Sequence, residues 1–120
     1  MKKGNIVQEK SFTFAIRIVK LYKFLTEEKK EFILSKQLLR SGTSIGANIE
    51  ESIGGQSERD FFMKITISYK ETRETIYWLK LLKATEYLTE EQANSILADA
   101  EELSRIIGKI QLTMKSRNSS

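Results

Sequence analysis

Four glutamates in the middle of the sequence have the residue type and spacing that catalysis or metal binding would use. They are Glu50, Glu51, Glu71 and Glu74. Paired carboxylates on facing helices hold the metals of di-iron bundles, but those sites also need a histidine three residues after a glutamate, and the chain has no histidine. Paired carboxylates can also hydrolyse glycosides, yet neither a cleft nor an aromatic platform can be read from the sequence. We therefore expect these acids to form a solvated face, or ion pairs with Arg59, Arg73 or Lys70.

Missing residue types argue against most other chemistry. The 120 residues include no cysteine, which removes disulfides and thiolates. The lack of histidine removes the commonest general base and the commonest metal ligand, and a zinc site would need carboxylates alone. The sequence therefore predicts that the protein is not an enzyme and has no metal or cofactor.

Basic side chains are concentrated in the first third of the chain. Residues 1–40 contain ten Lys or Arg and four Glu, a net charge of +6 within a total of +4. Four of these cations fall on the arc of the first predicted helix that its main apolar face leaves free: Lys10, Arg17, Lys20 and Lys23. Such a stripe attracts phosphate backbones without sequence specificity. The alternative is a solvated helix face that keeps the protein soluble.

Apolar residues recur every three or four positions in four segments, which is the spacing of amphipathic helices. The pattern predicts helices over residues 7–28, 31–53, 58–85 and 90–115. The chain has no proline, which helix interiors exclude. Because the connections are short, neighbouring helices should be antiparallel. We expect residues 1–120 to form one all-α domain, an antiparallel up-and-down four-helix bundle.

A second set of apolar residues lies opposite the main stripe on the first and third helices. Its members are Phe12, Ile16, Val19, Met63, Ile67, Trp78 and Leu81. A helix in a monomeric bundle needs only one apolar face, and exposed apolar patches usually mark interfaces. We expect a homo-oligomer contact with Trp78 as its anchor; the alternative is that these side chains cover the bundle edges.

Small residues fill the middle of the second predicted helix. Gly42 and Gly46 are four residues apart, so they lie on adjacent turns, and each costs about 1 kcal/mol relative to alanine in a helix. Close packing of a neighbouring helix is the simplest compensation, and ligand binding is the alternative.

Three local signals set the expected helix ends. Gly54 and Gly55 end the second helix, since glycine tolerates a left-handed exit. Ser57 is the N-cap of the third helix, and Thr89 with Gln92 forms a capping box before the fourth.

The ends of the chain carry little signal of their own. No apolar run approaches the roughly 20 residues that span a bilayer, and no signal peptide follows the lysines at the start. We expect no membrane association, a cytoplasmic protein, and a frayed tail over residues 117–120.

The run from Gln37 to Ser52, QLLRSGTSIGANIEES, resembles the hallmark of the bacterial four-helix bundle proteins known as 23S rRNA intervening-sequence proteins. The stretch from Ser57 to Phe61 and the segment KETRETIYWL from Lys70 to Leu79 resemble the corresponding parts of that family. The likeness covers roughly residues 8 to 115. Many members have proline where this chain has Gly46, a departure that relaxes the helix.

The resemblance implies a bundle that assembles into a ring, typically a pentamer, and it brings no catalytic residues. It also implies a gene within an insertion in a large-subunit rRNA gene, or a stand-alone relative. Related bundles accompany the reverse transcriptases of diversity-generating retroelements, where a basic surface is thought to meet nucleic acid. Our leading hypothesis is an oligomeric, non-enzymatic scaffold that binds RNA or DNA through the first helix. The alternative is an adaptor for a protein partner, such as a reverse transcriptase.

Overall fold

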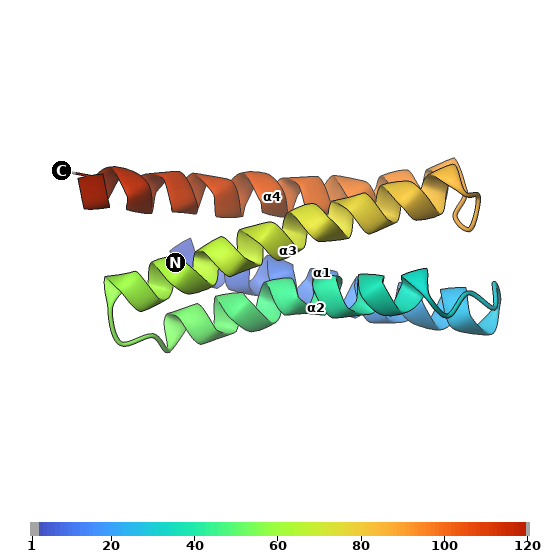
Figure 1. Cartoon of the computed structure of the whole chain (residues 1–120), viewed down its shortest axis with the longest axis horizontal. Helices are drawn as coiled ribbons and strands as arrows, with labels where there is room; N and C mark the ends of the chain where they lie inside the picture. Colours follow the sequence, from blue (N-terminus) through green and yellow to red (C-terminus); the bar gives the residue numbers. More distant parts are fainter. Residues whose placement is uncertain (1–2, 120) are drawn as a thin grey trace.

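The computed structural model describes residues 3–119, and all regular structure within them is helical (Figure 1). The four helices are α1 (Lys3–Glu27), α2 (Leu34–Ile53), α3 (Glu58–Ala84) and α4 (Glu90–Ser119). Each helix packs against the next one along the chain, and α4 returns to α1. The predicted antiparallel up-and-down four-helix bundle is confirmed.

The helices lie at the corners of an elongated bundle measuring 49 × 26 × 21 Å. α1 and α3 occupy opposite corners, as do α2 and α4, because neither pair makes a close backbone approach. The α1–α4 seam is the loosest of the four, and α2–α3 is the tightest. α2 therefore sits between two partners, α1 and α3, which are held apart from each other.

The apolar stripes read from the sequence meet in one core. Each helix contributes side chains at its predicted three- and four-residue spacing. Fully buried examples, one from each helix, are Ile18, Ile45, Leu79 and Ile107. Burial of these stripes is the main source of stability in a bundle of this kind.

The glycines of α2 let α1 approach closely, as the packing interpretation predicted. A methyl group built on Gly42 would lie 2.8 Å from Cγ1 of Ile18, and one on Gly46 would lie 3.2 Å from the backbone oxygen of Ser11. Ile18 is fully buried and Ser11 is nearly so. Both glycines therefore serve packing between α1 and α2.

On its other side, α2 contacts α3 through small polar side chains. The Thr75 hydroxyl lies 2.9 Å from that of Ser41, and the Ser68 hydroxyl donates to the backbone oxygen of Ile45 over 3.0 Å. All three polar side chains are fully buried. Because each finds a hydrogen-bond partner, their burial does not carry the cost of an unpaired polar group.

The start of α2 corrects the prediction that this helix begins at Glu31. The helix begins at Leu34. Glu31 lies in the loop before it, where its carboxylate accepts hydrogen bonds from backbone N–H groups at the start of the helix. Its carboxylate accepts backbone N–H groups of Ile33 at 3.1 Å, Leu34 at 3.0 Å and Ser35 at 2.7 Å. Burial alone raises the pKa of Glu31, but these three N–H donors outweigh it and leave the pKa below its usual value.

Other helix ends also differ from the prediction. α1 begins at Lys3 rather than residue 7, and α4 continues to Ser119, so the expected frayed tail is helical over residues 117–119. The left-handed exit expected at Gly54 is absent, since its φ is −85°. Among the described residues, positive φ angles fall instead on Lys30 and Glu86.

The predicted caps of α3 and α4 are present. Asp60 N donates to the Ser57 hydroxyl over 3.1 Å. Thr89 and Gln92 exchange two hydrogen bonds, of 3.0 and 3.1 Å, which completes the capping box. These short polar signals depend on neighbours within one helical turn, so they can be read without the tertiary structure.

We expect Gly42→Ala to destabilise the protein. The gain in helix propensity is about 1 kcal/mol, but the new methyl group would overlap three atoms of the buried Ile18, and overpacking a core costs about 1–3 kcal/mol. Urea unfolding at one fixed protein concentration measures the net effect. Gly54→Ala is the matched control, because the nearest atom to its methyl group would be 3.9 Å away. A Gly42 variant more stable than the parent, as helix propensity alone would make it, would contradict the packing role.

We expect the Glu31 cap to contribute a pH-dependent part of the stability. Its pKa is lowered in the folded state, so the contribution is complete above the usual glutamate pKa and is lost as the pH falls through the lowered one. Glu31→Gln should cost about 1 kcal/mol near neutral pH and flatten the decline in stability on acidification. The readout is the urea midpoint across the acidic range. Glu28→Gln, at an exposed position of the same loop, should keep the parent's decline, and identical profiles for both variants would refute the capping role.

Candidate functional site

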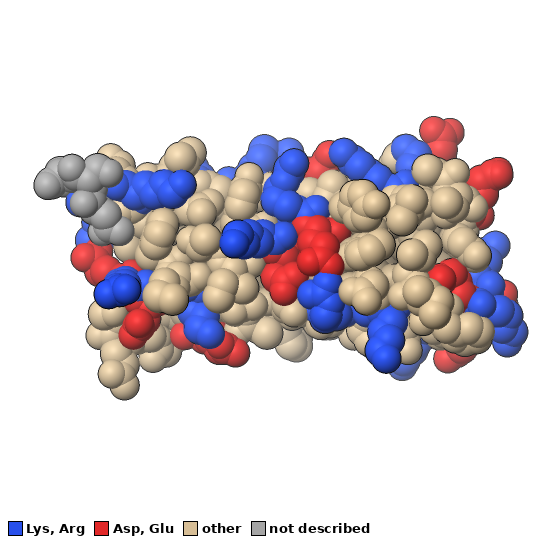
Figure 2. Space-filling view, in the orientation of Figure 1, with Lys and Arg blue, Asp and Glu red and all other residues tan. Residues whose placement is uncertain are grey.

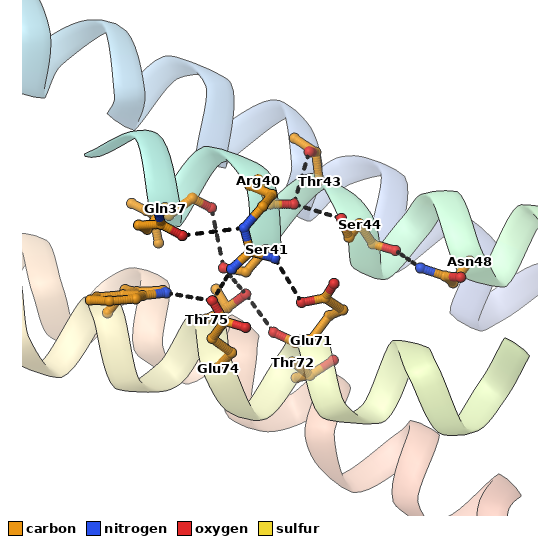
Figure 3. A network of polar contacts seen from close by, with 12 residues as sticks. Gln37, Arg40, Ser41, Thr43, Ser44, Asn48, Glu71, Thr72, Glu74 and Thr75 are labelled. Atoms are coloured by element: carbon orange, nitrogen blue, oxygen red, sulfur yellow. Dashed lines mark hydrogen bonds and ion pairs between the residues drawn. The ribbon is translucent and has the colours of Figure 1, made fainter. Parts of the chain in front are cut away.

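Two of the acids that the sequence singled out, Glu71 and Glu74, are held by a cation from the neighbouring helix α2 (Figure 3). Arg40 of α2 lies between Glu71 and Glu74 of α3, with its Nη1 atom 3.3 Å from Oε1 of Glu71 and its Nη2 atom paired with Oε2 of Glu74. The indole Nε1 of Trp78 donates to the same Glu74 oxygen over 2.8 Å. This cluster therefore ties α2 to α3 and leaves little carboxylate free for chemistry.

The other two glutamates are also engaged. Glu51 pairs with Lys64 at 2.6 Å, and Glu50 accepts a 2.7 Å hydrogen bond from Gln8. The prediction of ion pairs is confirmed for Glu51, Glu71 and Glu74, but the expected partners Arg59, Arg73 and Lys70 are wrong. The cations that form these pairs are Arg40 and Lys64. Within the described residues, no group of three or more acidic side chains is placed to hold a metal ion.

The predicted basic stripe of α1 divides into two pairs. Lys10 and Arg17 face α4, where Lys10 pairs with Glu102 at 3.3 Å and Arg17 with Asp99 at 2.6 Å. Arg17 also donates to the Ser95 hydroxyl over 3.0 Å. These two cations bridge the loosest seam of the bundle, so much of their charge is compensated within the chain.

Lys20 and Lys23 have exposed side chains with no ion pair among the described residues. Lys20 lines a groove of about 500 Å³ between α1 and α4, which Arg17 and Glu91 also line. Lys23 lies seven residues after Ile16, and two helical turns place it on the outer face of α1. The sequence could not separate these two lysines from Lys10 and Arg17, because the acids that pair with Lys10 and Arg17 lie 92 and 82 residues away along the chain.

The predicted second apolar stripe is exposed at five of its seven positions. The exposed fractions are 68% for Phe12, 42% for Ile16, 37% for Val19, 52% for Met63 and 39% for Ile67. We name Phe12, Ile16 and Val19 the α1 strip, and Met63 and Ile67 the α3 strip. The two strips lie on helices at opposite corners of the bundle, so they form two separate surfaces.

The remaining two members, Trp78 and Leu81, are half-buried in the single chain. Trp78 packs against the core and its indole N–H is used by Glu74. The tryptophan expected to anchor an interface therefore already has a structural role inside one chain. Apolar periodicity alone could not predict the half-burial of Trp78. It gives the face of the helix on which a side chain lies, but not the fraction of that side chain that the bundle covers.

One cluster was missed by the sequence reasoning. Arg73, Lys80 and Arg105 line a groove of about 280 Å³ between α3 and α4, together with Ile76, Glu101 and Ser104. The three cations are exposed and have no ion pair among the described residues. The seven-residue spacing of Arg73 and Lys80 on one face of α3 is the available signal, but the sequence interpretation offers Arg73 as an ion-pair partner of the four central glutamates.

None of the four helices over residues 3–119 has the length and apolar character needed to span a bilayer.

Comparison with known proteins adds a family to this description. No curated protein matches the chain. A crystal structure of a protein of unknown function from the S23 ribosomal protein family of Bacteroides thetaiotaomicron is similar, with 55% sequence identity and a TM-score of 0.90. The match covers 92% of this chain and 98% of that one.

The family model described as 23S rRNA-intervening sequence protein matches residues 3–109, which include all of α1, α2 and α3 and most of α4. The resemblance noted in the sequence is thus confirmed over nearly the whole bundle. The chain belongs to the 23S rRNA-intervening sequence protein family.

Proposed function

We propose that this protein is a non-enzymatic homo-oligomeric scaffold that assembles through the α1 strip and the α3 strip. The exposure of these two strips is the observation that supports assembly. Exposed apolar patches usually mark interfaces. A second copy packed against either strip would remove its apolar surface from solvent. The lack of histidine and cysteine, and the ion pairs of the central glutamates, support a role other than catalysis.

The separation of the strips favours a ring. A two-fold dimer would use one self-complementary surface, whereas contact between two different surfaces is head-to-tail and closes into a ring when the rotation permits. The α1 strip of one copy would then pack against the α3 strip of the next. The family resemblance implies a pentamer, which such a contact can generate.

Sedimentation velocity of single-strip variants tests this assembly. Phe12→Glu should remove the α1 strip and Ile67→Glu the α3 strip, and each variant alone should sediment as a monomer. Mixed together, they should form a heterodimer, because one intact strip of each kind remains. A two-fold dimer would instead leave one of the two variants unaffected.

Leu112→Glu is the matched control for that experiment. Leu112 is 68% exposed on α4, as exposed as Phe12, but it belongs to neither strip. This variant should keep the parent's mass. A parent protein that sediments as a monomer would reject the scaffold.

We further propose that the scaffold binds RNA or DNA through the basic face of α1. Lys20 and Lys23 are the unpaired cations of this face, since Lys10 and Arg17 are paired with α4. Lys23 follows Val19 by about one turn, beyond the end of the α1 strip, so a phosphate would reach it beside the subunit contact and not beneath it. The binding would be electrostatic and independent of sequence.

Neutralising these lysines should weaken binding and lower its salt dependence. For Lys20→Gln with Lys23→Gln, the slope of log K against log salt should fall by about 1.4 with single-stranded probes, as two lost phosphate contacts require. Fluorescence anisotropy measures this slope. Lys10→Gln with Arg17→Gln carries the same charge change and should have a smaller effect. No detectable binding by the parent at low salt would eliminate the nucleic-acid part.

An adaptor for another protein is the second candidate. Phe32 and Ile33, in the α1–α2 loop, are 58% and 74% exposed and lie outside both strips. A partner protein could cover them without disturbing the ring. In a pull-down, a partner protein that stays bound to the parent after nuclease treatment, but does not bind the Ile33→Glu variant, would favour this role over RNA or DNA binding.

A further inference from the structure

The groove between α3 and α4 carries more positive charge than its surroundings neutralise. It has a volume of about 280 Å³, and its charged residues are Arg73 and Lys80 from α3 with Glu101 and Arg105 from α4. Three cations thus share the groove with one carboxylate. Figure 2 shows acidic and basic side chains intermixed on the face where α2 and α3 lie in front, with Lys and Arg bordering a central cluster of Asp and Glu.

Exposed cations without an ion pair are common among the described residues, but in this groove three of them lie together. The seams held by Lys10–Glu102, Arg40–Glu71 and Lys64–Glu51 instead pair each cation with a carboxylate on a neighbouring helix. In the described part of the chain, Glu101 forms no such pair. The like charges of the groove repel one another, and an anion bound between them would lower that repulsion.

An exposed aromatic ring lies beside the cations. Tyr77 is 58% exposed, four residues after Arg73 and three before Lys80, so it neighbours both on the surface of α3. Its ring is edge-on to that of Trp78, with centroids 5.1 Å apart and planes at 72°. Trp78 is itself held by the 2.8 Å hydrogen bond to Glu74. Tyr77 is therefore oriented by its neighbours while much of its ring stays open to solvent.

We propose that this groove binds single-stranded nucleic acid. The three cations Arg73, Lys80 and Arg105 contact phosphates, and the Tyr77 ring stacks on a base. A positively charged groove combined with an aromatic ring is the arrangement that binds single strands independently of sequence. An acidic peptide would satisfy the cations but would give the tyrosine ring no base to stack on.

The groove is distinct from both surfaces assigned above. It uses α3 and α4, whereas the proposed α1 contact uses Lys20 and Lys23. Around α3, Arg73 lies roughly 120° from Ile67 and roughly 80° from Met63. Tyr77 lies about four turns along the helix from Met63. The groove and the α3 strip therefore occupy different parts of α3, and the proposal goes beyond the α1 contact without resting on it.

Fluorescence anisotropy with a labelled oligouridylate of about 16 nucleotides, the upper end of a typical single-strand site, tests the phosphate contacts. The groove variant combines Arg73→Gln, Lys80→Gln and Arg105→Gln. Its affinity should fall about ten-fold or more at low salt, and the slope of log K against log salt should fall by about 2, as three lost contacts require.

The matched control combines Lys36→Gln, Arg59→Gln and Lys109→Gln, three exposed cations with no ion pair among the described residues. It removes the same charge, so an effect equal to that of the groove variant would overturn the site. Because every substituted side chain is exposed, circular dichroism should show the parent's fold in both variants.

Tyr77→Leu tests the stacking. It keeps an apolar side chain, but it should weaken oligouridylate binding about five-fold or more while leaving binding to a duplex unchanged. Equal affinity of this variant and the parent for oligouridylate would overturn the single-strand assignment. Polyglutamate and unlabelled oligouridylate can each be added as competitors of the labelled probe. If polyglutamate displaces the probe as effectively as oligouridylate does, the single-strand assignment is overturned in favour of an acidic protein partner.

The same assay separates this site from the α1 contact. A loss confined to the Lys20 and Lys23 variant, with the groove variant unchanged, would support α1 and overturn the groove. The reverse result would support the groove alone. A parent that binds no probe would reject both sites, while sedimentation would still decide the assembly.

Discussion

The close approach of α1 to α2 is the constraint on which much of the bundle depends. Gly42 and Gly46 place no side chain between the two helices, so Ile18 and the backbone near Ser11 fill that space. With α1 held there, the buried Ser41 and Ser68 contacts can form on the other side of α2. α2 thus packs against both α1 and α3, and small residues contribute to both contacts.

Charge across the helix seams decides which side chains are available to partners. Arg40 ties α2 to α3 through Glu71 and Glu74, and Lys10 and Arg17 tie α1 to α4. Ion pairs at such exposed positions add little to stability. They nevertheless neutralise part of the basic stripe of α1, while the cations between α3 and α4 keep their charge. One cluster of unpaired cations therefore lies between α3 and α4, outside the segment where net charge along the sequence is highest.

The apolar strips and the basic groove suit different partners. The strips on α1 and α3 are wide apart and apolar, which fits copies of the same chain. The groove between α3 and α4 is polar and narrow, with one oriented tyrosine beside it. A scaffold of this kind can assemble through one set of surfaces and bind an anionic strand through another, because the two do not overlap around α3.

The sequence by itself determined the helical class, the four segments, the caps at Ser57 and Thr89, and the packing role of Gly42 and Gly46. These features depend on neighbours within a few residues or on helical periodicity, so they can be read locally. The tertiary structure decided that Glu31 caps α2 from outside it, that Arg40 and not Arg73 holds the central acids, and that Trp78 is half-buried. It also brought Arg105 beside Arg73 and Lys80. These outcomes depend on which helix faces which across the bundle, and spacing along one helix contains no information about the residues opposite it.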